Sequence, residues 1–512
     1  MHHLGHRVFL IAVAIFITAC VPRLYIAFQP ISIQLQKTLP DDSYYYFLTA
    51  KNILAGNGPS VDGRNNSNGW HPLWLAINLG VFSLPFEDAD MPVRVSLILG
   101  AIADSAVSVV LFLSIRRFLN ESAAIVGAVI YALNSMPIMQ SINGLETGLN
   151  ALLLSLSLFL SIAVIRQPAY RSAIAWGIAY GLCFLARTDS ALVLSPLGIF
   201  VLWNLPSEWR ARAIVMGVLS ALLVVTPWFV VNTMEFGSPL AQVSATAVPT
   251  AIRMRHELNS PDVPLWRLSW DTITQPNPWL RGDYTGTPVL LALPLWFLGV
   301  MGLYRTRLNT KFRLLWLACI AFIIGGLALI AVHTLVRWYP RPWYFVVNAQ
   351  SLSICLAFYW FSLHKPKIKL ATVTTVLPML VICGMFTWRI GYYPWQNRQY
   401  DASVWLQEHS APEVSVASMN SGIMGYYSGR TVVNLDGVVN PSAFNAIRNR
   451  SLMQYMRHEG VKYLIDFDLA IRDEYGPFMG AGFDQQIKEV AVLDEPYTGL
   501  GLMRIYEVLP SN

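Results

Sequence analysis

The stretch "LPDDSYYYF" (Leu39–Phe47) places two adjacent carboxylates, Asp41 and Asp42, in front of three tyrosines. It follows the first long apolar segment of the chain and precedes many more. Neighbouring carboxylates repel each other unless a proton, a cation or a hydrogen-bonding ligand comes between them. An acidic pair beside a membrane segment therefore has to be explained by its surroundings.

The composition indicates a polytopic membrane protein. Of 512 residues, 54% are hydrophobic and only 13% are charged, which is too apolar for an ordinary soluble enzyme. The net charge of +6 is small, and no basic stripe typical of nucleic-acid binding is present. All five cysteines fall in apolar segments, so neither a disulfide framework nor a zinc site is expected. The N-terminal apolar run lacks a small-x-small cleavage pattern and is interpreted as an uncleaved signal anchor.

The distribution of basic residues sets the expected topology. The Lys and Arg clusters between apolar segments can all be cytoplasmic only if the stretch 72–86 does not cross the membrane. That stretch is short and begins with His-Pro, so we expect a helix lying in the outer interface. About eleven transmembrane helices remain, with the N-terminus in the cytoplasm and the C-terminal region outside.

Two regions are predicted. Residues 1–389 form a transmembrane domain with external loops at 29–92, which holds the acidic pair and the juxtamembrane helix, and at 232–287. Residues 390–512 contain short apolar runs such as "TVVNLDG" and "VKYLIDF" alternating with helical patterns, which favours an extracytoplasmic α/β domain. Its Gly-rich turn "SGIMGYYSGR" lacks the spacing of a nucleotide-binding motif, so no nucleotide is assigned.

The acidic pair allows a structural and a chemical interpretation. Because Pro40 ends the preceding segment, one Asp fits the capping of the helix that begins "SYYYFLTAKNIL". Capping does not account for both carboxylates, and a pair suits a general base that takes a proton from an attacking hydroxyl. Tyr45, in the tyrosine run, is a candidate for lining a substrate cavity, and Asp41 and Asp42 are the candidate ligands if a divalent cation is bound.

External aromatic and basic residues supply further candidates. Trp70 fits an anchor for the interface helix and is also a cavity candidate, while His71 fits either a helix cap or a phosphate ligand. His333, Arg337 and Arg341 lie at the outer end of a span, against the positive-inside trend. Arginines there can snorkel to headgroups, but two guanidiniums four residues apart also suit a phosphate, and we favour that interpretation.

Two charged turns close the set of candidates. Glu146 in "NGLETG" and the pair Arg187 and Asp189 in "ARTDS" are expected near the outer ends of spans. Solvated turn residues are one interpretation, which we favour for Asp189. If the side chains face a central cavity instead, Glu146 and Arg187 become substrate-cavity candidates.

Together these parts resemble the GT-C superfamily of polytopic glycosyltransferases, which use polyprenyl-phosphate sugars as donors. The resemblance is carried by "PDDSYYYFLTAKNILAGNG" (40–58), "NGWHPLW" (68–74), "NGLETGLNALLLSL" (143–156), "FLARTDSALVL" (184–194) and, in the C-terminal region, "GYYSGRTVVNLDGVVN" (425–440). The chain looks most like bacterial cell-envelope enzymes of the arabinofuranosyltransferase-like and family-39-like types. Only the first external loop is diagnostic.

The resemblance implies a reaction and its residues. A sugar would pass from a polyprenyl phosphate to an acceptor hydroxyl of a cell-envelope glycan, lipid or protein at the outer face of a bacterial cytoplasmic membrane, with inversion. Asp41 or Asp42 would be the base, with Asp41 ranked first, while Arg337, Arg341 and either His71 or His333 would bind the phosphate. Some branches have Asp-Glu in place of Asp-Asp, which leaves the choice of base and a divalent cation open.

Two interpretations other than an enzyme predict different features. A transporter or flippase predicts helix interruptions near mid-membrane and paired halves, whereas these spans are largely uninterrupted and no repeat is evident. If the protein were a scaffold whose outer domain binds a partner, the acidic pair would have no role beyond helix capping. The external arginines would have no role beyond snorkelling to lipid headgroups. Which sugar and which acceptor are used does not follow from the sequence.

Overall fold

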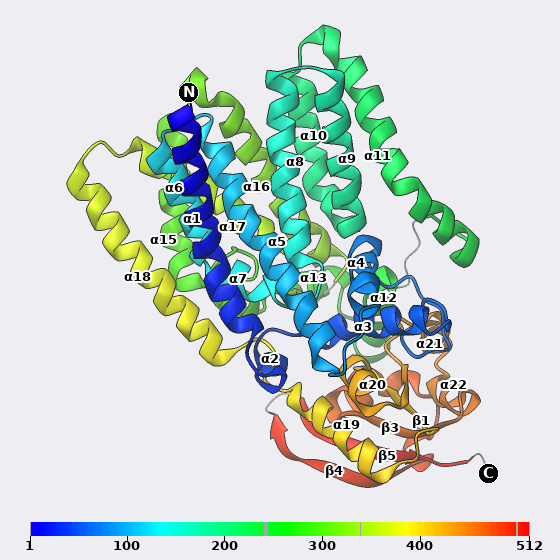
Figure 1. The fold of residues 1–512 in the computed structure, drawn as a ribbon. Coiled ribbons are helices and arrows are strands. Elements are labelled where there is room, and N and C mark those ends of the chain that lie inside the picture. Colours follow the sequence, from blue (N-terminus) through cyan, green and yellow to red (C-terminus); the bar gives the residue numbers. More distant parts are fainter. Residues whose placement is uncertain (1, 240–243, 338, 498–499, 511–512) are drawn as a thin grey trace. The chain divides into compact units, whose positions relative to one another are not determined.

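The computed structural model describes residues 2–239, 244–337, 339–497 and 500–510. Its internal contacts divide the chain into two compact units (Figure 1). Unit 1 consists of Met1–Gln29, Arg94–Trp228 and Ser269–Gly391. Unit 2 consists of Pro30–Val93, Phe229–Leu268 and Tyr392–Asn512, so it joins the acidic stretch to the C-terminal region.

The long apolar helices make this chain an integral membrane protein, as the composition predicts. Among the described residues, seven helices are long and apolar enough to cross a bilayer: α1 (His2–Ala27), α5 (Asp90–Arg116), α8 (Thr147–Arg166), α11 (Ser207–Phe236), α15 (Val289–Thr306), α16 (Arg313–Leu335) with the turn before it, and α18 (Pro366–Ile390). An eighth span results if α6 (Glu121–Leu133) and α7 (Ser135–Ser141), bent by 55°, count as one. Shorter helices are α9 (Tyr170–Ala186), α10 (Ala191–Asn204) and α17 (Val346–Ser362). The number eleven stays a prediction.

Large apolar side chains on these helices are exposed on the surface of the protein, which indicates an apolar environment. Leu223 on α11 is 78% exposed and Met385 on α18 is 69% exposed within the chain. Only 17% of the most apolar window of α11 and 6% of that of α18 is buried. A helix that is apolar on all sides and so little covered by protein is stable when lipid covers it.

A buried ion pair joins three helices of unit 1. The Arg23 Nε on α1 donates to the Asp104 Oδ2 on α5 over 2.9 Å, and both side chains are buried. The Tyr131 hydroxyl on α6 donates to the other Asp104 oxygen over 2.6 Å, and Arg23 Nη1 donates to the Ala132 carbonyl. Charges inside a membrane protein persist where they are paired in this way, because the isolated charge is costly in hydrocarbon.

Unit 2 contains a five-stranded sheet, which confirms the predicted C-terminal α/β fold. The strands are β1 (Ser415–Ser418), β2 (Thr431–Asn434), β3 (Val461–Phe467), β4 (Ile487–Tyr497) and β5 (Gly501–Val508), in the order β2-β1-β3-β5-β4. Strand β1 runs parallel to β2 and β3, whereas β5 is antiparallel to β3 and β4. The helices are α2 (Ile31–Lys37), α3 (Asp41–Leu54), α4 (Pro72–Phe82), α12 (Ser244–Asn259), α19 (Asn397–His409), α20 (Gly422–Ser428), α21 (Pro441–Arg448) and α22 (Leu452–His458). Helix α13 (Leu265–Thr274) begins in unit 2 and ends in unit 1, and α14 (Pro276–Arg281) belongs to unit 1.

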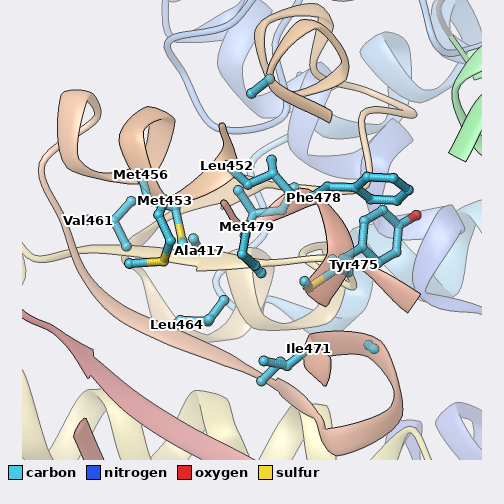
Figure 2. Packing of buried hydrophobic residues seen from close by; sticks show 14 of the residues in the cluster. Ala417, Leu452, Met453, Met456, Val461, Leu464, Ile471, Tyr475, Phe478 and Met479 are labelled. Atoms are coloured by element: carbon cyan, nitrogen blue, oxygen red, sulfur yellow. The ribbon is translucent and has the colours of Figure 1, made fainter. Parts of the chain in front are cut away.

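Both faces of the sheet are covered because successive strand residues point to opposite sides. Ile465 packs with Leu406 of α19, whereas its neighbour Leu464 packs with Met456 of α22. Figure 2 shows the second cluster, in which Met453 and Met456 lie beside Val461. A sheet buried on both faces gives the turns at its ends a fixed position.

The helix α4 is too short to cross a bilayer. Its 11 residues correspond to a length of roughly 16 Å at the α-helical rise, about half of the hydrocarbon core. It begins with Pro72 at its first helical position, where proline costs no hydrogen bond. These dimensions agree with the prediction that the stretch 72–86 does not span.

Candidate active site

The carboxyl ends of the three parallel strands of unit 2 carry its acidic and polar turn residues. The turn after β1 leads through Asn420 into α20, the turn after β2 contains Asp436, and Asp466 stands near the end of β3. Such edges are where open α/β sheets place their ligands, since the turns there converge and side chains do not fill the space. This edge is also where the acidic stretch of the first loop contacts the sheet domain.

Asp41 binds the start of α20. Its Oδ1 accepts the Ile423 N–H over 2.7 Å, and its Oδ2 accepts the Gly422 N–H over 3.1 Å. The side chain is 3% exposed. Asp41 does not occupy the N-cap of its own helix, because Pro40 stands there and no side-chain cap bond forms. Asp41 therefore caps the start of α20 and not the start of its own helix, α3.

Gly422 permits this close approach. A Cβ at residue 422 would lie 2.4 Å from the Asp41 carbonyl oxygen and 3.1 Å from its Cγ. Backbone atoms cannot move aside as a flexible side chain can, so only glycine fits at this contact. The Gly-rich turn that carries no nucleotide motif thus has a packing reason for its glycine.

Burial raises the pKa of Asp41 from its ordinary value to about 7. The negative charges of Asp42 and Asp466 raise the pKa further, while the N–H groups of Ile423 and Gly422 lower it by stabilising the carboxylate. Asp42 itself is half-buried. A carboxyl group with a pKa near neutrality is suited to accept a proton at physiological pH.

Asp436 is a third carboxyl group at this edge, and the sequence reasoning did not select it. Burial raises its pKa to about 8, and the charges of Asp42 and Asp41 raise it as well, although the Val438 N–H at 2.8 Å stabilises the ionised form. Its position at the end of an apolar strand, in "TVVNLDG", was the available signal. The signal was weak because acidic turns after strands are common.

Asp466 holds the turn that carries α20. Its Oδ2 accepts the Met419 N–H over 2.9 Å and the Asn420 N–H over 3.0 Å, and it also accepts the Ser418 hydroxyl over 2.8 Å. These bonds fix the chain just before Gly422. Asp466 is thus a positioning residue for the groups that bind Asp41.

The three tyrosines after the acidic pair serve three different contacts. The Tyr44 hydroxyl lies 3.1 Å from that of Tyr427 on α20. Tyr45 is buried, and its hydroxyl accepts the Asn434 amide at 3.4 Å at the end of β2. Tyr46 accepts the backbone N–H of His71 over 3.0 Å. Burial raises the pKa of Tyr45 well above the ordinary value, and the charges of Asp436, Asp41 and Asp42 raise it further.

The motif "NGWHPLW" contacts the same edge of the sheet. A Cβ at Gly69 would lie 2.5 Å from the Val438 carbonyl oxygen, in the turn that also carries Asp436. Trp70 is buried, and the half-buried His71 is the N-cap residue of α4, where its side chain makes no cap bond. The structure therefore brings Asp41, Trp70 and His71 into one unit, and their predicted substrate roles stay predictions.

Unit 1 holds the charged turns as one buried network. Arg187 donates to Glu146 over 2.6 Å and to both oxygens of Asp189, at 2.9 and 2.6 Å. His333 Nε2 lies 3.3 Å from Asp189, and its ring stacks on Tyr344 at 4.3 Å. Asp189, favoured as a solvated turn residue, is instead ion-paired. The two carboxylates compensate the Arg187 charge, and the cavity beside Asp189 measures only about 10 Å³, room for about one water.

Arg337 differs from this network. Its backbone adopts a left-handed φ of 61°, which is costly for a residue with a Cβ. Its Nε is buried without a hydrogen-bond partner among the residues that the structure describes. Strained residues with unsatisfied polar atoms are expected where a ligand supplies the missing contact. Arg341, half-buried, stacks on Trp343 at 5.8 Å.

A second carboxylate lies near the arginines of unit 1. Asp283 is buried, accepts Arg281 over 2.8 Å and has a pKa that burial raises to about 6. The positive charges of Arg281 and Arg341 both lower that pKa, which places Arg341 within electrostatic reach of the carboxylate. Arg341 is thus partly compensated, whereas the buried Nε of Arg337 has no hydrogen-bond partner within the described part of the chain.

Comparisons with known proteins agree with this fold. Residues 71–230 match the family model described as dolichyl-phosphate-mannose-protein mannosyltransferase, and residues 388–506 match a domain of unknown function, DUF8728. No curated protein sequence matches the chain significantly.

Two solved structures cover nearly the whole chain. ArnT from Cupriavidus metallidurans, solved bound to undecaprenyl phosphate, is similar over 96% of this chain and 97% of its own, with 13% identity and a TM-score of 0.59. The oligosaccharyltransferase AglB from Archaeoglobus fulgidus, solved with an inhibitory peptide and a dolichol-phosphate, is similar over 96% of this chain and 74% of its own, with 12% identity and a TM-score of 0.53.

The predicted resemblance to the GT-C superfamily is confirmed by this fold and by the family match. Together they support a membrane glycosyltransferase that takes its sugar from a polyprenyl-phosphate donor, and they do not favour the transporter or flippase.

Proposed function

We propose that this protein transfers a sugar, with inversion, from a polyprenyl-phosphate donor to a hydroxyl of a cell-envelope glycan, lipid or protein. The observation that carries the site is the carboxyl group of Asp41, buried at the sheet edge, held by the N–H groups of α20 and flanked by Asp42 and Asp436. Asp41 and Asp42 come from the start of α3, and Asp436 comes from the turn at the carboxyl end of β2.

Asp41 acts as the general base. Each of its oxygens accepts one backbone N–H, which leaves lone pairs for an acceptor hydroxyl. As the acceptor oxygen forms its bond to the anomeric carbon, its proton passes to Asp41, and the bond between that carbon and the phosphate oxygen breaks. A pKa near 7 makes this transfer effective at neutral pH, and burial together with the charges of Asp42 and Asp466 holds the pKa up.

Arg337 and Arg341 bind the phosphate of the donor. The transition state of glycosyl transfer is oxocarbenium-like, and negative charge grows on the departing phosphate. Guanidinium groups stabilise that charge with paired hydrogen bonds, and the buried Nε of Arg337 is a donor that needs such a partner. The Arg187 guanidinium binds Glu146 and lies 4.8 Å from the centre of the Tyr344 ring, on which His333 also stacks, so these three side chains fix the position of Tyr344 near the arginines.

The location follows from the distribution of charge. The loops rich in Lys and Arg, such as 305–313 and 364–369, face the cytoplasm by the positive-inside rule. The N-terminus is then inside and unit 2 lies on the outer face of a bacterial cytoplasmic membrane. The undecaprenyl phosphate bound to ArnT and the dolichol-phosphate bound to AglB support a donor that stays anchored in the bilayer.

The acidic residues do not form an evident cation site. Within the described ranges no three His, Cys, Asp or Glu side chains are grouped to hold a metal ion, and both Asp41 oxygens already accept N–H donors. No step is therefore assigned to a metal. A divalent cation at Asp41 and Asp42 stays a prediction, which transfer assays with and without a chelator test.

Reconstituted protein tests the function directly. The assay supplies a panel of polyprenyl-phosphate sugars with membrane-derived acceptors to the native chain and to Asp41→Asn and Asp42→Asn. Transfer by the native chain that is lost in Asp41→Asn is expected. Full transfer by both variants would show that neither Asp41 nor Asp42 is the base. Solute counterflow without sugar transfer would favour a transporter.

A further inference from the structure

An apolar groove lies among four helices of unit 1. It has a volume of about 150 Å³ and is lined by residues of α6, α15, α17 and α18, including Val129, Leu298, Leu356 and Val376. The lining side chains are apolar except for Tyr359, Trp360 and Thr372, which are contributed by α17 and α18. An apolar space of this size excludes water and accepts an apolar guest.

One face of α18 forms a wall of the groove. Thr372, Val376 and Leu380 recur at intervals of four residues, which places them along one side of a helix. Val373 and Leu377 line the groove and are 39% and 37% exposed, so the groove is open beside these two residues of α18. A groove of this form accommodates an extended chain rather than a compact molecule.

The same helix face continues into basic residues. Lys369 stands one turn before Thr372 and Val373, and its ammonium group lies 5.3 Å from the centre of the Trp360 ring at the end of the groove. Lys365 precedes Lys369 by one more turn and, like Lys367, is exposed. Glu121 is the first residue of α6, four residues before the lining residue Ile125, and its carboxylate is paired with Arg7 at 2.7 Å.

We propose that this groove binds one acyl chain of an anionic phospholipid, with Lys365 and Lys369 contacting the headgroup phosphate. An apolar slot that ends at a cluster of ammonium groups matches a molecule with a hydrocarbon tail and a negative head. The Trp360 ring marks the boundary between the two, as aromatic residues do at membrane interfaces.

The donor lipid does not suit this groove. Arg341, a proposed ligand of the donor phosphate, precedes the first turn of α17, whereas Trp360 stands in its last turn. Fourteen residues separate Val346 from Trp360, or roughly 20 Å along the helix. A headgroup at the lysines and one at Arg341 therefore lie at opposite ends of a membrane helix. The groove mouth belongs to the cytoplasmic leaflet under the proposed topology, which is the leaflet with anionic lipid.

Native mass spectrometry of the purified full-length chain tests the proposal. The protein is incubated with phosphatidylglycerol or phosphatidylcholine of equal chain length, and retained lipid is counted. Preferential retention of phosphatidylglycerol is expected. Val376→Trp, which fills the groove, should abolish retention, and Lys369→Gln should weaken it about fivefold, as roughly 1 kcal/mol for one basic residue at an anionic surface predicts.

Controls separate the groove from general membrane charge. Lys311→Gln removes an exposed lysine from a different basic loop and should leave retention unchanged. The surface variant with Lys365, Lys367 and Lys369 all changed to Gln decides the question if Val376→Trp does not fold. Equal retention of both phospholipids, unchanged retention in the triple variant, or mole-for-mole displacement by undecaprenyl phosphate would each overturn the proposal.

Discussion

The Asp41 carboxylate accepts the backbone N–H of Ile423 at 2.7 Å across a separation of 382 residues. The bond joins α3 to the start of α20 within unit 2, and it places the candidate base at the carboxyl edge of the parallel strands. A structural role and a catalytic role therefore meet in one side chain, so that a test has to separate them.

Asp41→Asn should reduce sugar transfer by about 10²-fold or more, the usual contribution of a general base. The NH2 group of the new asparagine would face a backbone N–H that the carboxylate accepted, so one hydrogen bond is lost. The free energy of unfolding should therefore fall by about 1–3 kcal/mol. Asp466→Asn is the matched control, because Asp466 also accepts N–H groups in this unit but serves only to position them. Equal losses of transfer in the two variants would assign Asp41 a structural role.

The pH dependence should separate activity from stability. Since the folded-state pKa of Asp41 is raised to about 7 and that of Asp436 to about 8, the native state holds protons that the unfolded chain has released above pH 4. Stability should therefore fall as pH rises between about 4 and 8, whereas transfer should rise through pH 7 as Asp41 ionises. Thermal unfolding and initial rates at several pH values measure both, and a transfer rate that is flat between pH 6 and 8 would argue against Asp41 as the base.

Gly422→Ala should disrupt the contact between α3 and α20. The new methyl group would lie 2.4 Å from the Asp41 carbonyl oxygen, so the melting temperature and transfer should both fall. Gly80→Ala provides the comparison, because nothing lies within 4 Å of a Cβ there, and alanine should stabilise α4 by roughly 0.5–1 kcal/mol. If both variants melt like the native chain, the contact does not have the geometry described.

Arg337→Gly should relieve backbone strain and weaken donor binding together. Glycine tolerates the φ of 61°, so stability should rise by about 1 kcal/mol, while the KM for the lipid-linked donor should rise about tenfold or more. Arg450→Gly relieves a similar φ of 53° at an exposed residue of unit 2 and should leave the donor KM unchanged. An unchanged KM for the donor in Arg337→Gly would show that Arg337 does not bind the donor phosphate.

Breaking the buried ion pair should destabilise the membrane helices. Arg23→Met or Asp104→Leu leaves one buried charge without its partner, and we expect a loss of roughly 3–5 kcal/mol. The double variant Arg23→Met/Asp104→Leu should recover most of it, because no uncompensated charge remains. Thermal unfolding in detergent compares the four proteins, and additive losses would show that the two residues act independently.

Local composition and spacing determined the class of this protein. Long apolar segments require lipid or a buried core, so the helical membrane fold follows from hydrophobic length alone, and alternating apolar runs in 390–512 determined the five strands. The acidic pair and the external basic residues were visible as candidates because each violates a local expectation for a membrane chain.

The partners of those candidates were decided by tertiary structure. Contacts between residues far apart in the chain decide which N–H groups bind Asp41 and bring Asp436 near it. Such contacts also place Glu146 beside Arg187, whose charge Glu146 and Asp189 compensate. Sequence spacing carries no information on such distances, because turns and sheet order set them. The pKa of a carboxyl group, and with it the identity of a base, depends on burial and neighbouring charge, which only the folded chain provides.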